Sequence, residues 1–101
     1  MWRETGAVVI RRFRDDEARK IFEGERSRRL PADVQSVMRR KLKMLDAAVE
    51  LADLRVPPGN RLEPLKADRA GQYSIRVNDR WRICFRWTPA GPTDVEIADY
   101  H

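Results

Sequence analysis

Regular alternation of apolar and polar residues in the C-terminal third of the chain constrains the fold more than any other feature. Apolar side chains occupy every second position from residue 72 to 77, and the pattern resumes from residue 80 to 87. A period of two is typical of a strand with one buried face. Asn78-Asp79 separates the two segments, and both residues tolerate the positive φ of a tight turn. The sequence therefore predicts an antiparallel hairpin, and a second turn at residues 89–92 extends it to a three-stranded meander.

The two faces of this predicted sheet differ in chemistry. One face is apolar and is expected to be core: Tyr73, Ile75, Val77, Trp81, Ile83, Phe85, Trp87, Val95 and Ile97. The other face collects Arg76, Arg80, Arg82, Arg86 and Tyr100. Because the helices should cover the apolar face, we expect the basic face to remain uncovered.

The N-terminal half predicts one strand and two helices. The β-branched segment 8–13 indicates a strand, and Asp15-Asp16 can cap a helix that runs to about Phe22. Pro31 suits the first position of a second helix, whose apolar positions continue at helical spacing to Val49. The order strand, helix, helix, loop and strands predicts an α+β fold with both helices packed on one face of the sheet.

The second predicted helix also carries a basic run, namely Arg39, Arg40, Lys41 and Lys43. A solvated helix face is the favoured interpretation of this run. The alternative is a surface that follows an RNA backbone or binds an acidic partner.

Length and composition place the chain among single-domain proteins without disulfides. With 101 residues it can build one core, and its single cysteine, Cys84, excludes an intramolecular disulfide. Cys84 lies in an apolar strand, so a packed thiol is favoured over a nucleophile. One histidine and one cysteine leave few ligands for zinc. No apolar run approaches the roughly 20 residues of a membrane span, and residues 1–7 lack the apolar stretch of a signal peptide. We therefore expect a soluble, cytoplasmic protein.

The charge balance indicates an anionic partner. The chain has 21 Lys and Arg against 16 Asp and Glu, and its pI is about 10. A basic domain of this size often binds nucleic acid or an acidic protein. Most of these cations are arginines, whose planar donors match phosphate geometry better than lysine does.

Cleavage of RNA without a metal needs a base for the 2′-hydroxyl, cations for the phosphorane and an acid for the leaving oxygen. The basic face offers the cations, and His101 is the only side chain whose unperturbed pKa suits proton transfer at neutral pH. Metal-dependent cleavage is less favoured because Asp94, Glu96 and Asp99 form no recognisable cluster. Exposed arginines are more often solubilising charges, and a terminal histidine is usually a frayed end. From these residues alone, a generic nucleic-acid- or protein-binding module is favoured over a nuclease.

Three segments, in order, resemble the HigB-type toxins of the RelE/ParE superfamily. They are the loop Arg61-Leu62-Glu63-Pro64-Leu65-Lys66-Ala67-Asp68-Arg69-Ala70-Gly71, the hairpin Tyr73-Ser74-Ile75-Arg76-Val77-Asn78-Asp79-Arg80-Trp81-Arg82-Ile83-Cys84-Phe85 and the ending Asp99-Tyr100-His101. The resemblance covers residues 8–101, which we interpret as the toxin domain, and leaves residues 1–7 as an N-terminal extension.

The resemblance implies a RelE-like fold and the toxin of a type II toxin–antitoxin system. Such toxins cut messenger RNA on the ribosome and inhibit translation, without metal or other cofactor. Their HigA-type antitoxin has a helix-turn-helix domain and brings the complex to operator DNA. No membrane is involved.

By position, the family's functional residues carry over to this chain. Tyr100 and His101 would transfer protons or orient the 2′-hydroxyl, and Asp99 would orient a neighbouring side chain. Arg82 and Lys66 would stabilise phosphate charge, with further RNA contacts expected from Arg76, Arg80 and Arg86.

Glu63 departs from the resemblance, because several HigB toxins have a histidine there. A carboxylate can act as a base but repels phosphate. Either Glu63 is that base, or His101 works alone, or the activity is weak. A weakly active or degenerate toxin that mainly binds its antitoxin and modulates operon repression is therefore the alternative. A gyrase poison on the same fold is less favoured, because that branch does not share the Tyr100-His101 ending.

Overall fold

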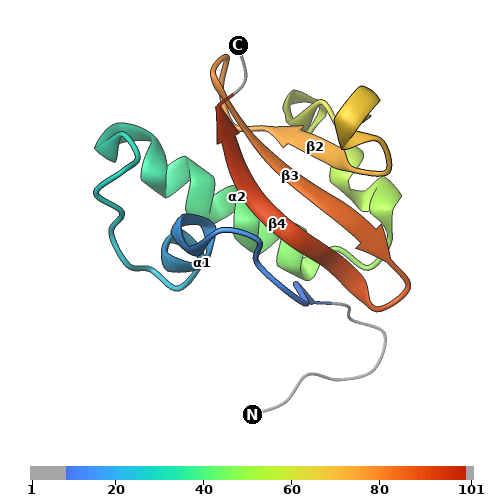
Figure 1. Ribbon diagram of the computed structural model, residues 1–101, viewed down its shortest axis with the longest axis horizontal. Coiled ribbons are helices and arrows are strands. Elements are labelled where there is room, and N and C mark those ends of the chain that lie inside the picture. Colours follow the sequence, from blue (N-terminus) through green and yellow to red (C-terminus); the bar gives the residue numbers. More distant parts are fainter. Residues whose placement is uncertain (1–8, 100–101) are drawn as a thin grey trace.

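A four-stranded antiparallel sheet and two helices make up the α+β fold that the sequence predicts (Figure 1). The computed structural model describes residues 9–99. The strands lie in the order β1-β2-β3-β4, so each strand pairs with its sequence neighbour. The helices and strands are α1 (Asp16–Phe22), α2 (Gln35–Ala47), β1 (Glu63–Pro64), β2 (Tyr73–Arg76), β3 (Trp81–Thr88) and β4 (Gly91–Asp99). Four short 3-10 turns, η1 (Ala32–Val34), η2 (Leu51–Arg55), η3 (Pro58–Asn60) and η4 (Ala67–Arg69), connect them.

The first strand predicted from the sequence is wrong over the described residues 9–13. This segment makes a single parallel bridge, between Phe13 and Val95 of β4. The amide of Arg14 donates to the Val95 carbonyl at 2.8 Å, and the Val95 amide donates to the Arg12 carbonyl at 3.1 Å. Pairing stops there because α1 begins three residues later. The strand that periodicity missed is β1, whose two residues are too few to show alternation.

Asp15 caps α1 as predicted and also ties the helix to the sheet. One carboxylate oxygen accepts from the Ala18 amide at 2.8 Å, which satisfies a free donor of the first helical turn. The other oxygen accepts from the Ile97 amide of β4 at 3.0 Å. A single aspartate therefore fixes where α1 begins and where it lies against β4.

The second helix is shorter than predicted. Pro31 precedes the turn η1, and α2 ends at Ala47, so Val49 is 51% exposed rather than part of the apolar stripe. The interpretation of the basic run as a solvated face holds for Arg39, Arg40 and Lys43 but is wrong for Lys41, which is 6% exposed. Lys41 follows Met38 by three residues and precedes Leu45 by four, so helical periodicity turns it toward the core.

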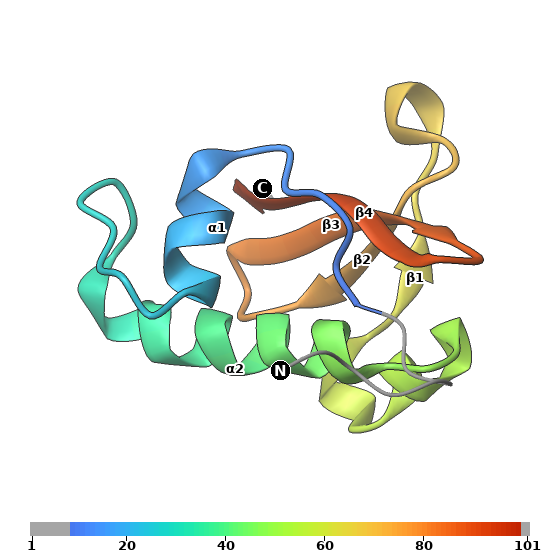
Figure 2. The same ribbon diagram turned by 90° about the horizontal axis from the view of Figure 1, so that it is seen from below.

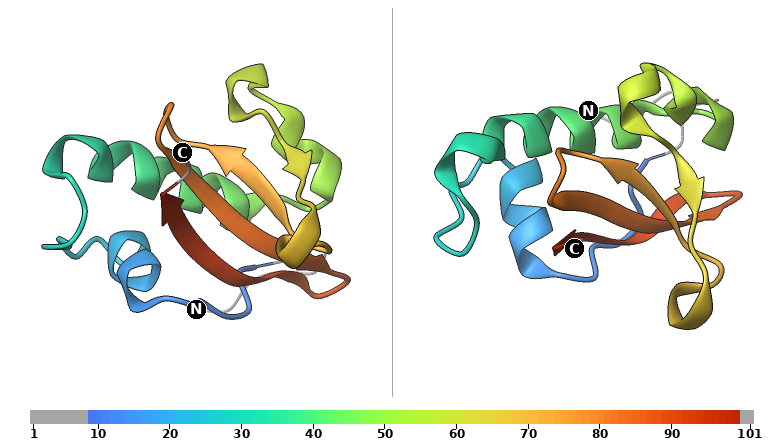
Figure 3. Two further views of the ribbon diagram at one scale, coloured as in Figure 1. Left: turned by 45° about the horizontal axis from the view of Figure 1, so that its top comes forward. Right: turned by 90° about the horizontal axis from the view of Figure 1, so that it is seen from above.

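The core lies between α2 and one face of the sheet. Figure 2 shows α2 running along that face, and Figure 3 shows α1 beside β4. The alternation of the hairpin correctly predicted the sheet's contribution. The fully or nearly buried members of the core include Ile21, Met38, Leu42, Leu45, Leu54, Ile75, Val77, Trp81, Ile83, Phe85 and Val95.

Lys41 and Asn60 form a polar contact inside this core. The Lys41 ammonium donates to the side-chain oxygen of the fully buried Asn60. The Asn60 amide nitrogen donates to the carbonyls of Leu54 at 3.1 Å and Val56 at 3.4 Å. Asn60 therefore joins α2 to the turn that leads into β1. Burial lowers the pKa of Lys41, and the charges of Arg40 and Arg76 lower it further.

Because its pKa is lowered, Lys41 should make the stability of the folded protein depend on pH. The unfolded chain holds the Lys41 proton up to its ordinary pKa of about 10.4, whereas the folded chain releases it earlier. The free energy of unfolding should therefore rise with pH between the folded and unfolded pKa values, relative to a Lys41→Met variant. Urea denaturation of both proteins at pH values from 7 to about 10.5 measures this difference. A difference that is flat with pH would contradict the prediction.

Candidate functional site

The sheet face away from α2 carries two rows of functional side chains. In one row Ser74, Cys84 and Glu96 are cross-strand partners, and in the next Arg76, Arg82 and Ala98 are partners. Directly opposed residues in a sheet share a face, so each row lies side by side across the strands. We use the name arginine face for this surface and its four arginines, Arg69, Arg76, Arg82 and Arg86.

The middle of the arginine face is not uncovered, contrary to the prediction. Ser74 and Cys84 are both fully buried. Glu96 is the cross-strand partner of Cys84, Arg69 bonds Glu96, and the charges of Arg69, Glu96 and Arg82 act on the Cys84 thiol. Burial is the main cause that raises the pKa of this thiol. Cys84 therefore forms part of the floor of the face, in agreement with its interpretation as a packed thiol.

Glu96 of β4 contacts two arginines from other parts of the chain. Its carboxylate accepts from the Arg69 guanidinium at 3.1 Å and lies 3.6 Å from the Arg14 guanidinium. Arg69 also donates to the side-chain oxygen of Gln72 at 3.0 Å, and its bond with Glu96 raises its pKa. These contacts fix the loop between β1 and β2 against β4. The sequence carried no signal for the Arg69–Glu96 pair, because 27 residues separate the partners and no motif links them.

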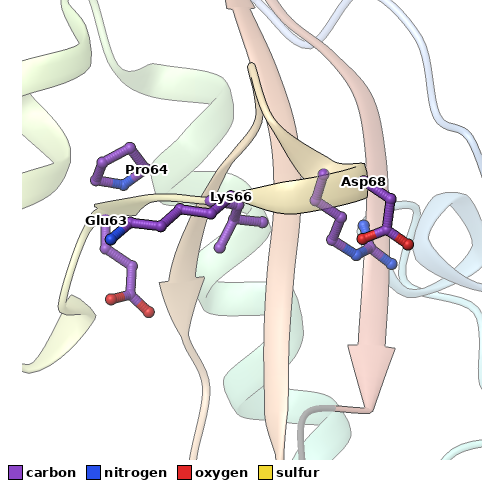
Figure 4. A pocket seen from close by; sticks show the side chains of 6 residues that line it. Glu63, Pro64, Lys66 and Asp68 are labelled. Carbon is purple, nitrogen blue, oxygen red and sulfur yellow. The ribbon is translucent and has the colours of Figure 1, made fainter.

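The loop from β1 to η4 forms a shallow pocket beside the arginine face. It rises from the sheet on the side away from α2 (Figure 2). The pocket has a volume of about 320 Å³, and in Figure 4 the Lys66 side chain runs back toward Glu63. Both side chains are exposed, and the structure gives Lys66 no ion pair among residues 9–99. The six residues that line the pocket are Glu63, Pro64, Leu65, Lys66, Asp68 and Arg69.

Arg82 lies near the start of β3, just after the hairpin turn, and is half-buried on the arginine face. One of its terminal nitrogens donates to the carbonyls of Asn78 and Trp81, the second at 3.3 Å. The Asn78 side chain in turn accepts from the amides of Arg80 at 2.9 Å and Trp81 at 2.8 Å, which builds the predicted turn. The turn therefore sets the position of the Arg82 guanidinium.

The other predicted arginines have acidic neighbours. Arg76 pairs with the exposed Asp79 and lowers the pKa of that carboxyl group. The Arg86 guanidinium lies 3.6 Å from Asp94, which also pairs with Arg12 at 3.1 Å. Asp94 has a φ of 51° at a register shift, where β4 has one residue more than β3. The bulge thus presents Asp94 to both arginines.

Arg80 does not share the face that alternation predicted for it. Its guanidinium donates to both carboxylate oxygens of Asp99, at 3.1 and 2.8 Å. Its central carbon also lies 5.0 Å from the centre of the Trp81 ring. Asp99 is the register partner of Trp81, so this pair lies on the core side of the sheet. The pairing raises the pKa of Arg80 and fixes the end of β4. Tyr100 and His101, which follow in the sequence, lie outside the described residues.

Replacing Gly71 with alanine should destabilise the loop that carries Lys66. Gly71 has a φ of +92°, and a Cβ atom there would lie 2.8 Å from an Arg86 terminal nitrogen. We expect a loss of about 1–2 kcal/mol, because the strained backbone and the displaced arginine both contribute. Gly59→Ala is the matched control, since a Cβ at Gly59 would meet no atom within 4 Å. Urea denaturation measures both variants, and equal losses would contradict the prediction.

The chain matches known toxins over almost its whole length. Residues 11–101 match the family model described as the RelE-like toxin of the type II toxin–antitoxin system HigB. The chain belongs to this family. It is 42% identical to Toxin HigB-1 of Vibrio cholerae over 74% of this chain and 80% of the relative. It is 30% identical to Endoribonuclease HigB of Proteus vulgaris over 92% of this chain and all of the relative. A solved YoeB/ParE toxin from Agrobacterium tumefaciens matches 94% of this chain and 98% of its own, with 19% identity and a TM-score of 0.48.

In this HigB-family toxin, part of the predicted site is brought together. Arg76 and Arg82 share one face, with the loop of Glu63 and Lys66 beside it, whereas Arg80 and Asp99 form a separate pair. Within residues 9–99, no three His, Cys, Asp or Glu side chains converge to hold a metal ion. None of the described helices has the length and apolar character needed to cross a membrane.

Proposed function

We propose that this HigB-family toxin is a cytoplasmic endoribonuclease that cuts messenger RNA on the ribosome, without a metal, and so inhibits translation. The arginine face beside the exposed Lys66 is the observation that supports this proposal. Membership of a type II toxin–antitoxin family implies an antitoxin partner. We propose that this partner is a HigA-type protein with a helix-turn-helix domain, through which the toxin reaches operator DNA.

The proposed reaction is a transfer within the RNA strand. The 2′-oxygen forms a bond to the adjacent phosphorus while the bond from phosphorus to the 5′-oxygen breaks, which leaves a cyclic phosphate and a 5′-hydroxyl. The base takes the 2′-hydroxyl proton, and the acid returns a proton to the leaving 5′-oxygen. Cations around the phosphorane lower its energy more than that of the substrate.

Most of the predicted residues have a role in this reaction. His101 and Tyr100 transfer protons or orient the 2′-hydroxyl, and Lys66 and Arg82 stabilise the phosphorane. The Arg80–Asp99 pair anchors the end of β4, and Tyr100 and His101 follow it in the sequence. Arg76 and Arg86 contribute positive charge around the RNA backbone.

Primer extension on messages after expression without the antitoxin tests the proposed function. Wild-type protein should slow growth and leave new message ends, whereas His101→Ala should remove both effects. Growth arrest by His101→Ala equal to that of the wild type would contradict the site assignment.

A second candidate, a weakly active toxin that mainly binds its antitoxin, is favoured by Glu63. This carboxylate is exposed in the pocket that holds Lys66, where it opposes the approach of phosphate (Figure 4). Under this alternative, purified protein would leave ribosomes translating while changing the operator affinity of the antitoxin. Glu63→Gln distinguishes the two, because removing the charge should increase cleavage if the carboxylate only repels RNA and abolish it if the carboxylate is the base.

A further inference from the structure

The outer edge of β4 is paired by the segment that leads into α1. The Val95 amide donates to the Arg12 carbonyl at 3.1 Å, and the Arg14 amide donates to the Val95 carbonyl at 2.8 Å. These bonds begin a parallel ladder, in which Phe13 and Val95 form the single bridge. The ladder does not continue with backbone groups, because α1 begins at Asp16.

A side chain takes the place of the backbone where this ladder ends. The next outward amide of β4 belongs to Ile97, and it donates to a carboxylate oxygen of Asp15 at 3.0 Å. In a longer parallel pair a backbone carbonyl would accept this bond. The half-buried Asp15 carboxylate therefore replaces a strand at this point, and its charge makes the bond stronger than one between two neutral groups.

The other oxygen of Asp15 caps α1. It accepts from the Ala18 amide at 2.8 Å. Serine and asparagine cap helices about as well as aspartate does. Each of them has one acceptor oxygen, whereas a carboxylate has two that accept at the same time. Capping alone therefore does not require an aspartate here, but capping together with the bond to the Ile97 amide does.

The end of β4 is also held from the side of β3. Trp81 of β3 is the register partner of Asp99, the last residue of β4. The Arg80 guanidinium donates to both carboxylate oxygens of Asp99, at 3.1 and 2.8 Å. The start of α1 lies beside this end of the strand (Figures 2 and 3). The last residues of β4 are thus fixed on one edge by β3 and on the other edge by Asp15, which bonds Ile97.

Tyr100 and His101 follow this end of β4 in the sequence and lie outside the described residues. His101 comes four positions after Ile97, so a change in the direction of the strand end alters where these two residues can reach. Proton transfer requires the acid or base to lie within hydrogen-bond reach of its partner. A misplacement of about 1 Å can lower a rate by a factor of about 100.

We propose that Asp15 is a positioning residue for the proposed catalytic end of the chain, and that it acts through its bond to the Ile97 amide. This inference rests on the proposed function, in which Tyr100 and His101 transfer protons or orient the 2′-hydroxyl. Asp15 fixes the direction in which β4 delivers those two residues to the RNA. Its effect should therefore fall on the rate of the chemical step rather than on the binding of RNA.

Message cleavage by an Asp15→Ser variant separates positioning from capping. The shorter serine side chain keeps an oxygen for the Ala18 amide but does not reach the Ile97 amide. We expect kcat to fall about ten- to hundredfold, with a change in KM of less than about twofold, because RNA still binds while the catalytic end is misplaced. Asp16→Ser is the matched control, since it removes the same charge from the neighbouring exposed position and should keep the wild-type kcat.

Two measurements on the same variants do not require cleavage. Hydrogen exchange of the Ile97 amide should be about tenfold faster in Asp15→Ser, whereas the Ala18 amide should stay protected. His101 is the only histidine of the chain, so its imidazole gives a single set of NMR signals. These signals should shift in Asp15→Ser and stay in place in Asp16→Ser. Thermal melting of each variant establishes that it is folded.

Asp15→Asn is a second variant in case the serine variant does not fold. Its side chain has one oxygen and one NH2 group, so only one of the two backbone amides has an acceptor at a time, and kcat should fall by a smaller factor. The proposal is overturned if both Asp15 variants cleave as fast as Asp16→Ser, or if the His101 signals stay in place while the Ile97 amide exchanges faster. Shifted His101 signals in a protein whose wild type leaves no new message ends would retain the positioning role and refute the proposed cleavage, so the two failures are distinguishable.

Discussion

Replacement of Asn60 by leucine should lower the free energy of unfolding by about 3–5 kcal/mol. The variant loses the two donor bonds to the carbonyls of Leu54 and Val56. It also leaves the Lys41 ammonium in the core without the oxygen that now accepts its hydrogen bond. For a domain of this size each kcal/mol lowers the melting temperature by about 4–8 °C. Thermal and urea denaturation should therefore both show a large loss of stability.

A double-mutant cycle with Lys41→Met separates the two causes of this loss. Methionine keeps much of the apolar volume of the lysine stem and removes the buried charge, so the single substitution should cost less than Asn60→Leu. In the Lys41→Met background, Asn60→Leu should cost at least about 1 kcal/mol less than it does alone. Strictly additive losses would show that Lys41 does not depend on Asn60.

Local patterns predicted the parts of the fold that local forces determine. Asp15 was identified as the cap of α1 because its side chain bonds an amide three residues away, and Asn78 was placed in the turn for a similar reason. The first strand failed because pairing depends on a distant partner, and only one bridge, to Val95, forms. Residue type predicts a surface position for Lys41, although its position in the helix points inward.

The site was predictable as a set of residue types but not as a geometry. Alternation placed Arg76 and Arg82 on one face, and the structure agrees. It placed Arg80 there too, but the strand begins one residue later and the side chain instead pairs with Asp99. The Arg69–Glu96 pair joins distant segments, and no spacing rule reveals such a contact. The roles of Tyr100 and His101 stay predictions.

Arg82→Ala should lower kcat for ribosome-dependent message cleavage by a factor of about 10²–10³, with a smaller change in KM. On the proposed mechanism, its guanidinium stabilises the charge that develops on the phosphorane rather than the charge already present in the RNA. The structure supports this assignment because the bonds to the carbonyls of Asn78 and Trp81 fix the guanidinium before RNA arrives. A donor held in place in this way loses little free energy to reorganisation during the reaction.

Those same bonds require a control for folding, because the alanine variant should also lose about 1 kcal/mol of stability. Arg82→Lys retains a charge but not the planar donors, so it should recover only part of the lost rate. Arg55→Ala, an exposed position without an ion pair among residues 9–99, should cleave at the wild-type rate. If Arg82→Ala melts near the wild-type temperature and cuts messages as fast, the phosphorane is stabilised elsewhere. Lys66 would then be the strongest candidate, because it is exposed in the pocket beside this face.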